Sequence, residues 1–173
     1  ELKAILNRNS ATKPIKSKTF STILKSKKVP SQNVYLTSAE LKRLHNYQPM
    51  NERERYAKFM FMRECLTGAR CVDCRRFTIA NLHTIDGTEY LTYVPQKHPG
   101  EVSVPVHRWL LQYRVDDWAD NERNIRNDHL NEPIRDMCRK CGITDEVSVF
   151  SNGKTKVGKK YQFIATHTGR RTF

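Results

Sequence analysis

The chain has 173 residues, with 31 Lys and Arg against 18 Asp and Glu, which gives a formal net charge of +13. Seven Phe, seven Tyr and two Trp supply enough apolar surface for a core, so the composition excludes disorder throughout the chain. No apolar run approaches the roughly 18 residues of a membrane span, so we expect no membrane association. The excess of cations favours a polyanionic partner, because Lys and Arg that neutralise phosphates release condensed counterions.

The first 33 residues carry eight Lys and Arg against Glu1 alone. Residues 11–33 are rich in Lys, Ser, Thr and Pro, which is typical of a linker. Residues 1–8 could be the last turns of an upstream helix, and a chain that starts at Glu1 rather than Met is expected to lack its beginning. We therefore expect a domain over residues 34–173. The candidate phosphate contacts of the linker are Lys13, Lys16, Lys18, Lys25, Lys27 and Lys28.

The domain is expected to begin with two helices. Thr37 and Glu40 have the spacing of a capping box, which predicts a helix from about Ser38. A second helix is predicted from about Glu52 to Leu66, and its apolar residues lie nearly all round, so it belongs in the core. A turn over residues 66–70 then leads into a short helix that starts at CVDC (71–74).

A β-hairpin is predicted next. The runs EYLTYV (89–94) and EVSVPV (101–106) are separated by PQKHPG. In the second run Val102, Val104 and Val106 alternate with other residues, which is the pattern of a half-buried strand. Lys97 lies in or beside the turn of this hairpin.

The rest of the chain predicts three more helices. One is expected around His107–Trp118, one around Asp128–Cys141, and one opening near Thr166, after a β-like VSVF (147–150) and a turn rich in Gly and Lys. The fold class is therefore mainly α with a small antiparallel β-sheet, an α+β domain.

Four basic residues stand at polar breaks between apolar segments: Arg70, Lys97, His167 and Arg170. Guanidinium groups can clamp two oxygens of a phosphate as its transition state gains charge. A lysine can protonate a leaving oxygen, and a histidine can move a proton near neutral pH. Each residue alone also has an ordinary interpretation, as a surface ion pair, a solvated turn residue or a helix-cap donor.

The order of these residues resembles that of the tyrosine recombinase (phage integrase) family, in the style of integrases of bacterial mobile elements. The TG-x-R motif of the family falls on Arg70, its supporting carboxylate on Asp73, and its hairpin lysine on Lys97. The H-x-x-R motif falls on His167 and Arg170. VYLTSAELKRL (34–44) also resembles the usual entry into the catalytic domain, and the basic linker resembles the one that joins it to a core-binding domain.

The resemblance implies the catalytic-domain fold and a reaction on double-stranded DNA without metal or cofactor. A tyrosine attacks the scissile phosphate and gives a 3′-phosphotyrosyl intermediate, and a 5′-hydroxyl then reverses the step. Arg70 and Arg170 would hold the non-bridging oxygens, Lys97 would protonate the leaving oxygen and His167 would assist. Arg171 would be a further cation near the phosphates. The family implies a cytoplasmic, bacterial or phage-encoded protein that is tetrameric on DNA.

The family carries a second His or Trp and its nucleophilic Tyr beyond the H-x-x-R motif. Both would fall after Phe173, so we expect a fold incomplete at its C-terminus, and a monomeric fragment that binds DNA without cleaving it. Tyr161 precedes His167 and does not fit as a substitute.

Two C-x-x-C pairs, Cys71 with Cys74 and Cys138 with Cys141, are compatible with a zinc site. The long separation between the pairs and their place on predicted helices favour cysteines that pack as small apolar side chains. Cys65, in the apolar second helix, is expected in the core. We therefore expect no metal.

Two other functions remain open on the sequence alone. One is a regulator that keeps this fold and binds DNA without catalysis. The other is a zinc-dependent nucleic-acid protein, which a zinc measurement on the purified chain would test.

Overall fold

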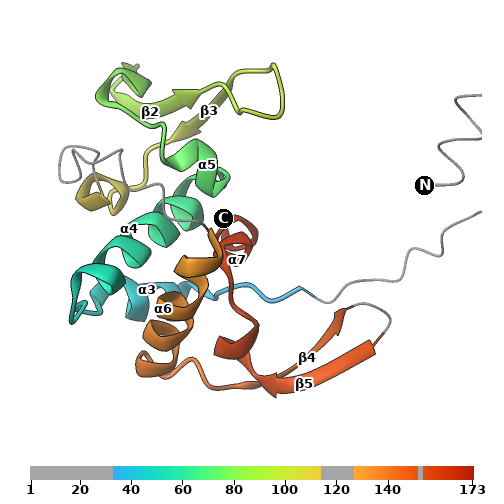
Figure 1. The fold of residues 1–173 in the computed structure, drawn as a ribbon. Coiled ribbons are helices and arrows are strands. Elements are labelled where there is room, and N and C mark those ends of the chain that lie inside the picture. Colours follow the sequence, from blue (N-terminus) through green and yellow to red (C-terminus); the bar gives the residue numbers. More distant parts are fainter. Residues whose placement is uncertain (1–32, 114–126, 152–153) are drawn as a thin grey trace, which may run out of the picture. The chain divides into compact units, whose positions relative to one another are not determined.

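The computed structural model describes residues 33–113, 127–151 and 154–173 (Figure 1). Ser31–Phe173 form a compact unit. The six linker lysines proposed to contact DNA, Lys13, Lys16, Lys18, Lys25, Lys27 and Lys28, lie outside the described residues.

The unit is mainly helical, with two small antiparallel sheets, which confirms the predicted fold class. Its α-helices are α3 (Ser38–Asn46), α4 (Glu52–Thr67), α5 (Cys71–Cys74), α6 (Asn127–Lys140) and α7 (Thr166–Thr172). Its 3-10 turns are η1 (Ile79–Asn81), η2 (Leu110–Tyr113) and η4 (Lys160–Phe163). Its strands are β1 (Leu82–Ile85), β2 (Thr88–Tyr93), β3 (Val102–Pro105), β4 (Glu146–Ser151) and β5 (Lys154–Lys159).

Local hydrogen bonds at helix ends confirm the first two predicted helices. The Thr37 hydroxyl accepts from the Glu40 N–H at 3.3 Å, and the Glu40 carboxylate accepts from the Thr37 N–H at 2.6 Å. This reciprocal pair is the predicted capping box of α3. Helix α4 begins where the Asn51 side chain accepts from the Glu54 N–H, and it ends at Gly68, whose φ is +64°.

Helix α4 is the centre of the core. It packs against α7, α6, α5 and η2 (Figure 1), and all of its residues from Tyr56 to Thr67 are buried. Its fully buried Phe61 and Met62 meet Ile134 and Met137 of α6 in one apolar cluster. The prediction of a core helix is confirmed.

The first sheet has the order β1-β2-β3, all antiparallel. The predicted β2–β3 hairpin is confirmed, with Tyr93 opposite Val102 in the register. Strand β1 was not expected, because its residues are mostly exposed and show no apolar alternation. Its turn into β2 is formed by Asp86 and Gly87, both at positive φ, and this Asp-Gly pair is the one local hairpin signal of the segment.

The second sheet pairs β4 with β5. Strand β4 confirms the β-like run, whereas β5 occupies residues that were expected to form a turn. The expectation failed because KTKVGK is polar and nearly all exposed, so backbone hydrogen bonds to β4 rather than burial define this strand.

The helix predicted around His107–Trp118 is wrong for its described part, where only the 3-10 turn η2 forms. Residues 114–118 lie outside the described residues. The helices α6 and α7 confirm the other two predictions, with α7 beginning at Thr166.

All five cysteines are free thiols. Cys65, Cys71, Cys74 and Cys138 are buried in the core and Cys141 is half-buried, which fits the interpretation that they pack as apolar side chains. Among the described residues, no three His, Cys, Asp or Glu side chains gather where they could hold a metal ion. No helix in the described part of the chain is long and apolar enough to cross a membrane.

Candidate nucleic-acid site

A pocket of about 490 Å³ lies at the C-terminal end of α4, and both candidate arginines line it. Arg70 reaches it from the α4–α5 junction and Arg170 from α7, although the two are far apart in the sequence. Asp73, Tyr93 and His98 also line it. We call this cavity, defined by these five residues, the arginine pocket.

Arg70 is placed by the way α4 ends. The N–H of Gly68 donates to the Glu64 carbonyl at 3.0 Å, and the left-handed conformation of Gly68 turns the chain out of the helix. A Cβ at Gly68 would lie 2.6 Å from the Phe173 ring, so glycine also allows the chain end to pack there. Arg70 follows at once as the residue before α5 and is half-buried.

Arg170 is placed by the close packing of α7 on α4. A Cβ at Gly169 would lie 2.8 Å from the Cβ of Glu64 and 3.3 Å from the Phe61 ring. Only glycine therefore allows this approach without a shift of one of the helices. The next residue, Arg170, is exposed and lines the arginine pocket.

Helix α6 fixes the start of α7. The Asn131 side chain accepts from the Thr166 N–H at 2.9 Å, and the Arg135 side chain donates to the Ile164 carbonyl at 2.9 Å. These bonds hold the H-x-x-R segment against the core, so the position of Arg170 does not depend on α7 alone.

Asp73 acts through the β2–β3 connection. Its side chain is buried and accepts from the Gln96 N–H at 2.9 Å, while the Arg76 guanidinium lies 3.9 Å away. The carboxylate thus fixes the start of the loop that runs from residue 94 to residue 101. This contact fits a positioning role for Asp73 near the arginine pocket.

Tyr93 is a pocket residue that the sequence did not single out. Burial raises the pKa of its phenol, as do Cys74 and Asp73, and the opposing effects of Arg170 and Arg70 do not cancel this rise. The hydroxyl therefore stays protonated at neutral pH and can donate a hydrogen bond into the pocket. The strand period was the available signal, because Tyr93 shares a face of β2 with the buried Leu91.

The other two candidate catalytic residues do not line the arginine pocket. Lys97 is exposed in the β2–β3 connection, as expected from the hairpin, but its neighbour His98 is the residue that lines the cavity. No sequence signal other than its place beside Lys97 pointed to His98. His167 is exposed in the first turn of α7, and Arg171 is exposed later in the same helix.

The pocket suits an anion with several oxygens. Neither Arg70 nor Arg170 forms an ion pair with any described acidic residue, so both guanidinium groups are available to a ligand. Two acidic residues, Glu101 and Asp73, also line the pocket. The Asp73 carboxylate already accepts a hydrogen bond from the Gln96 N–H of the β2–β3 loop. Two planar donor forks and a phenol can together contact both non-bridging oxygens of a phosphodiester.

No family model and no curated protein matches the chain. The solved structures that resemble it include two of the XerH site-specific recombinase bound to its DNA substrate. One is the pre-cleavage complex with the difH substrate (TM-score 0.53, 12% identity, 81% of this chain and 41% of that chain). The other is the post-cleavage complex with palindromic difH (TM-score 0.53, 12% identity, 81% and 40%).

The chain therefore spans about two fifths of the length of these recombinase chains. At this identity the likeness concerns the fold, and it shows that the helices and small sheets are arranged as in a tyrosine recombinase.

Proposed function

We propose that the chain is the phosphate-binding part of a site-specific DNA recombinase of the tyrosine recombinase type. The observation that carries the proposal is the meeting of Arg70 and Arg170 in one pocket, within a fold shared with a recombinase that binds DNA. Residues 34–173 would be the catalytic-domain portion, and residues 1–33 the end of a core-binding helix and its linker.

In the proposed reaction the two arginines hold the non-bridging oxygens of the scissile phosphate. Charge builds up on these oxygens in the pentacoordinate transition state, where fixed guanidinium groups stabilise it more than in the ground state. Lys97 protonates the leaving 5′-oxygen, His167 assists proton transfer, and Asp73 keeps the Lys97 loop in place. The covalent 3′-phosphotyrosyl bond conserves the energy of the phosphodiester until a 5′-hydroxyl attacks it.

The attacking hydroxyl is assigned to a tyrosine outside residues 1–173. All seven tyrosines of the chain are described, and only Tyr93 lines the arginine pocket. The raised pKa of Tyr93 disfavours the phenolate that would attack. Tyr161, in η4, packs against the apolar core and is not among the residues that line the pocket.

Double-stranded DNA is the proposed partner. Arg171 and the linker lysines would contact the backbone, and four copies would assemble on DNA. Affinity should then fall steeply as salt rises, because each phosphate contact releases counterions.

The test is a covalent trap. The complete gene product is mixed with nicked suicide duplexes that cover the DNA flanking its gene, and the products are separated under denaturing conditions. The proposal predicts a protein–DNA adduct that resists denaturation and is removed by protease. The absence of any adduct, in a preparation that binds the same duplexes, would reject it.

A second candidate is a regulator that binds DNA on this fold without cleaving it. It is favoured by the positions of Lys97 and His167, which lie outside the lining of the arginine pocket. This candidate predicts tight binding in the same assay, no adduct, and no effect of Arg70→Ala on its function in the cell.

A further inference from the structure

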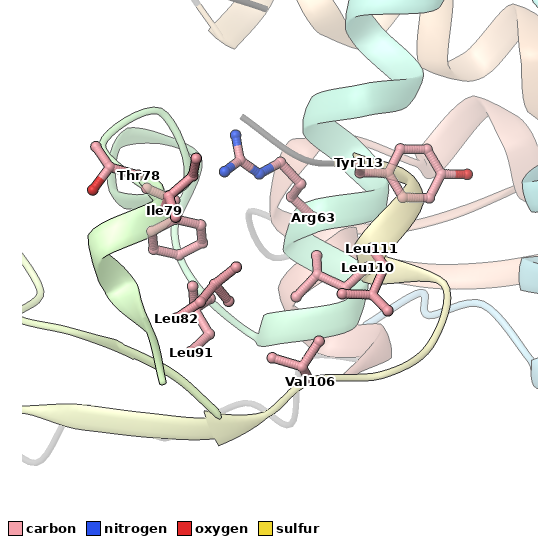
Figure 2. Close-up of a pocket in the computed structure, with 10 residues that line it drawn as sticks. Arg63, Thr78, Ile79, Leu82, Leu91, Val106, Leu110, Leu111 and Tyr113 are labelled. Carbon is pink, nitrogen blue, oxygen red and sulfur yellow. The ribbon is translucent and has the colours of Figure 1, made fainter. Parts of the chain in front are cut away.

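A second pocket lies between α4, the η1 turn and η2, separate from the arginine pocket (Figure 2). We call it the apolar pocket. Its volume is about 110 Å³, and its walls include Arg63, Ile79, Leu82, Leu91, Val106 and Leu110. Arg63 is the one cation among the residues that line it, so an apolar cavity contains a single positive charge.

Arg63 is almost completely buried, and the described part of the chain offers it no charged partner. The residue is 4% exposed. Its backbone carbonyl accepts from the Thr67 hydroxyl at 2.6 Å, whereas its side chain forms no hydrogen bond or ion pair with any described residue. Its buried Nε is unpaired. Figure 2 shows the guanidinium reaching from α4 toward Thr78 and Ile79.

Two aromatic rings lie close to this guanidinium. The guanidinium carbon lies 4.8 Å from the centre of the Phe59 ring and 5.1 Å from that of Phe77. Both rings therefore make cation–π contacts with the guanidinium. The N–H donors lie in the guanidinium plane, and the buried Nε–H has no acceptor there among the described residues.

A buried arginine does not become neutral by releasing a proton. Burial lowers its pKa, but a guanidinium remains protonated in proteins. An uncompensated buried charge is unfavourable, and buried charges are normally paired. The described residues supply no carboxylate to this one, which points to a ligand.

We propose that the apolar pocket binds a small organic monocarboxylate, with its carboxylate on the Arg63 fork and its apolar body against Leu82, Leu91 and Val106. A planar carboxylate matches the paired N–H donors of a guanidinium.

The lining favours a carboxylate over a phosphate. Besides Arg63, the polar side chains of the lining belong to Thr78 and Tyr113. The Thr78 hydroxyl already donates to Asn81, and the Tyr113 hydroxyl is bonded to His45 at 2.9 Å. One free cation can neutralise one negative charge, whereas a phosphate dianion would leave charged oxygens unpaired among leucines.

The size of the pocket limits the apolar body of the ligand. An apolar cavity of about 150 Å³ is known to hold benzene. The apolar pocket is somewhat smaller but is not fully enclosed, so it suits a compact body, such as a short branched chain or a single ring with one edge at the opening.

The test uses benzoate as the probe and its neutral analogue benzamide as the matched control. Both are titrated into the ¹⁵N-labelled 173-residue chain at constant ionic strength, with inorganic phosphate present to occupy the arginine pocket. Benzoate should bind saturably, at least tenfold more tightly than benzamide, and should shift the amides of Ile79, Leu82 and Leu91. Amide shifts confined to Arg70 and Arg170 would contradict the proposal.

Two variants separate the charge from the cavity. Arg63→Met should abolish the preference for benzoate, whereas Arg55→Met, an exposed arginine on the same helix, should leave it unchanged. Leu111→Trp fills the cavity without removing Arg63 and should reduce binding of both probes at least tenfold, which keeps the test valid if Arg63→Met does not fold. Equal binding of the two probes, binding of neither, or a preference that survives Arg63→Met would overturn the proposal.

Discussion

Helix α4 buries two neighbouring ionisable residues on two different faces. Arg63 faces the apolar pocket, whereas Glu64 faces α7, where its Cβ is close to Gly169. Both have a buried atom without a hydrogen-bond partner, Nε in Arg63 and Oε1 in Glu64. The two residues are 4% and 1% exposed, so burial alone does not distinguish them.

What distinguishes them is whether the charge can be lost. Burial raises the pKa of Glu64 to about 8, against the opposing effects of a hydrogen bond from Cys71 and the charge of Arg75. Glu64 is therefore mainly neutral at pH 7, whereas Arg63 stays charged. A buried acid can become neutral by taking up a proton, whereas a buried arginine needs a partner.

The pH dependence of stability gives the largest expected effect. The folded-state pKa of Glu64, about 8, lies above its ordinary value of 4.5, so the folded state keeps a proton that the unfolded state releases. Stability from this group is complete below about pH 4.5 and is lost as pH rises toward 8, by up to about 1.4 kcal/mol per pH unit. Glu64→Gln should remove this loss.

Urea unfolding of the chain at pH 5 and pH 8 measures this effect. The Gln variant should gain stability over the natural chain at pH 8, by several kcal/mol, and much less at pH 5. Parallel pH profiles for the two proteins would show that Glu64 is ionised when folded.

A paired buried cation provides the second test of the comparison. Lys160 lies 2.7 Å from the Glu40 carboxylate, and both side chains are largely buried. Burial raises the pKa of Glu40, but Lys160 and Thr37 lower it more. Lys160→Met should lower the free energy of unfolding by about 3 kcal/mol, because Glu40 is then left as an uncompensated buried charge. Chemical denaturation measures this loss of unfolding free energy. Adding Glu40→Gln to the Lys160→Met variant should recover part of the lost stability.

The same substitution at Arg63 should act in the opposite direction, with a smaller effect. Arg63→Met removes a charge that has no described partner and keeps most of the apolar volume, so stability should rise by about 1 kcal/mol in the absence of ligand. Thermal unfolding in chloride buffer checks the sign. A loss of stability as large as that expected for Lys160→Met would mean that Arg63 is paired within the chain.

The sequence predicted those elements that local signals or apolar patterns define. The capping box at Thr37, the apolar run of α4 and the alternating valines of β3 all correspond to elements of the structure. The sequence did not predict strand β5, whose polar residues are held by backbone hydrogen bonds to the neighbouring strand β4. Such pairing is a property of two segments and leaves little trace in either one.

The functional residues also divide into those that local motifs mark and those that depend on contacts between distant segments. The motifs identified Arg70 and Arg170, and the structure brings both to the arginine pocket because Gly68 and Gly169 permit the turn and the helix contact. Burial of Arg63 could not be predicted, because an arginine in an apolar helix normally extends to solvent. Its surroundings come from η1 and η2, which no periodic pattern marks.

The most direct test of the central claim is the rate at which Arg170→Ala forms the covalent adduct on the suicide duplex under single-turnover conditions. We expect a rate about 10²- to 10³-fold below that of the natural protein, because one fixed donor to the transition-state oxygens is lost. Arg139→Ala, an exposed arginine outside the arginine pocket, should react at the natural rate. An Arg170→Ala protein that reacts as fast as the Arg139→Ala control would contradict the assignment of the arginine pocket to the scissile phosphate.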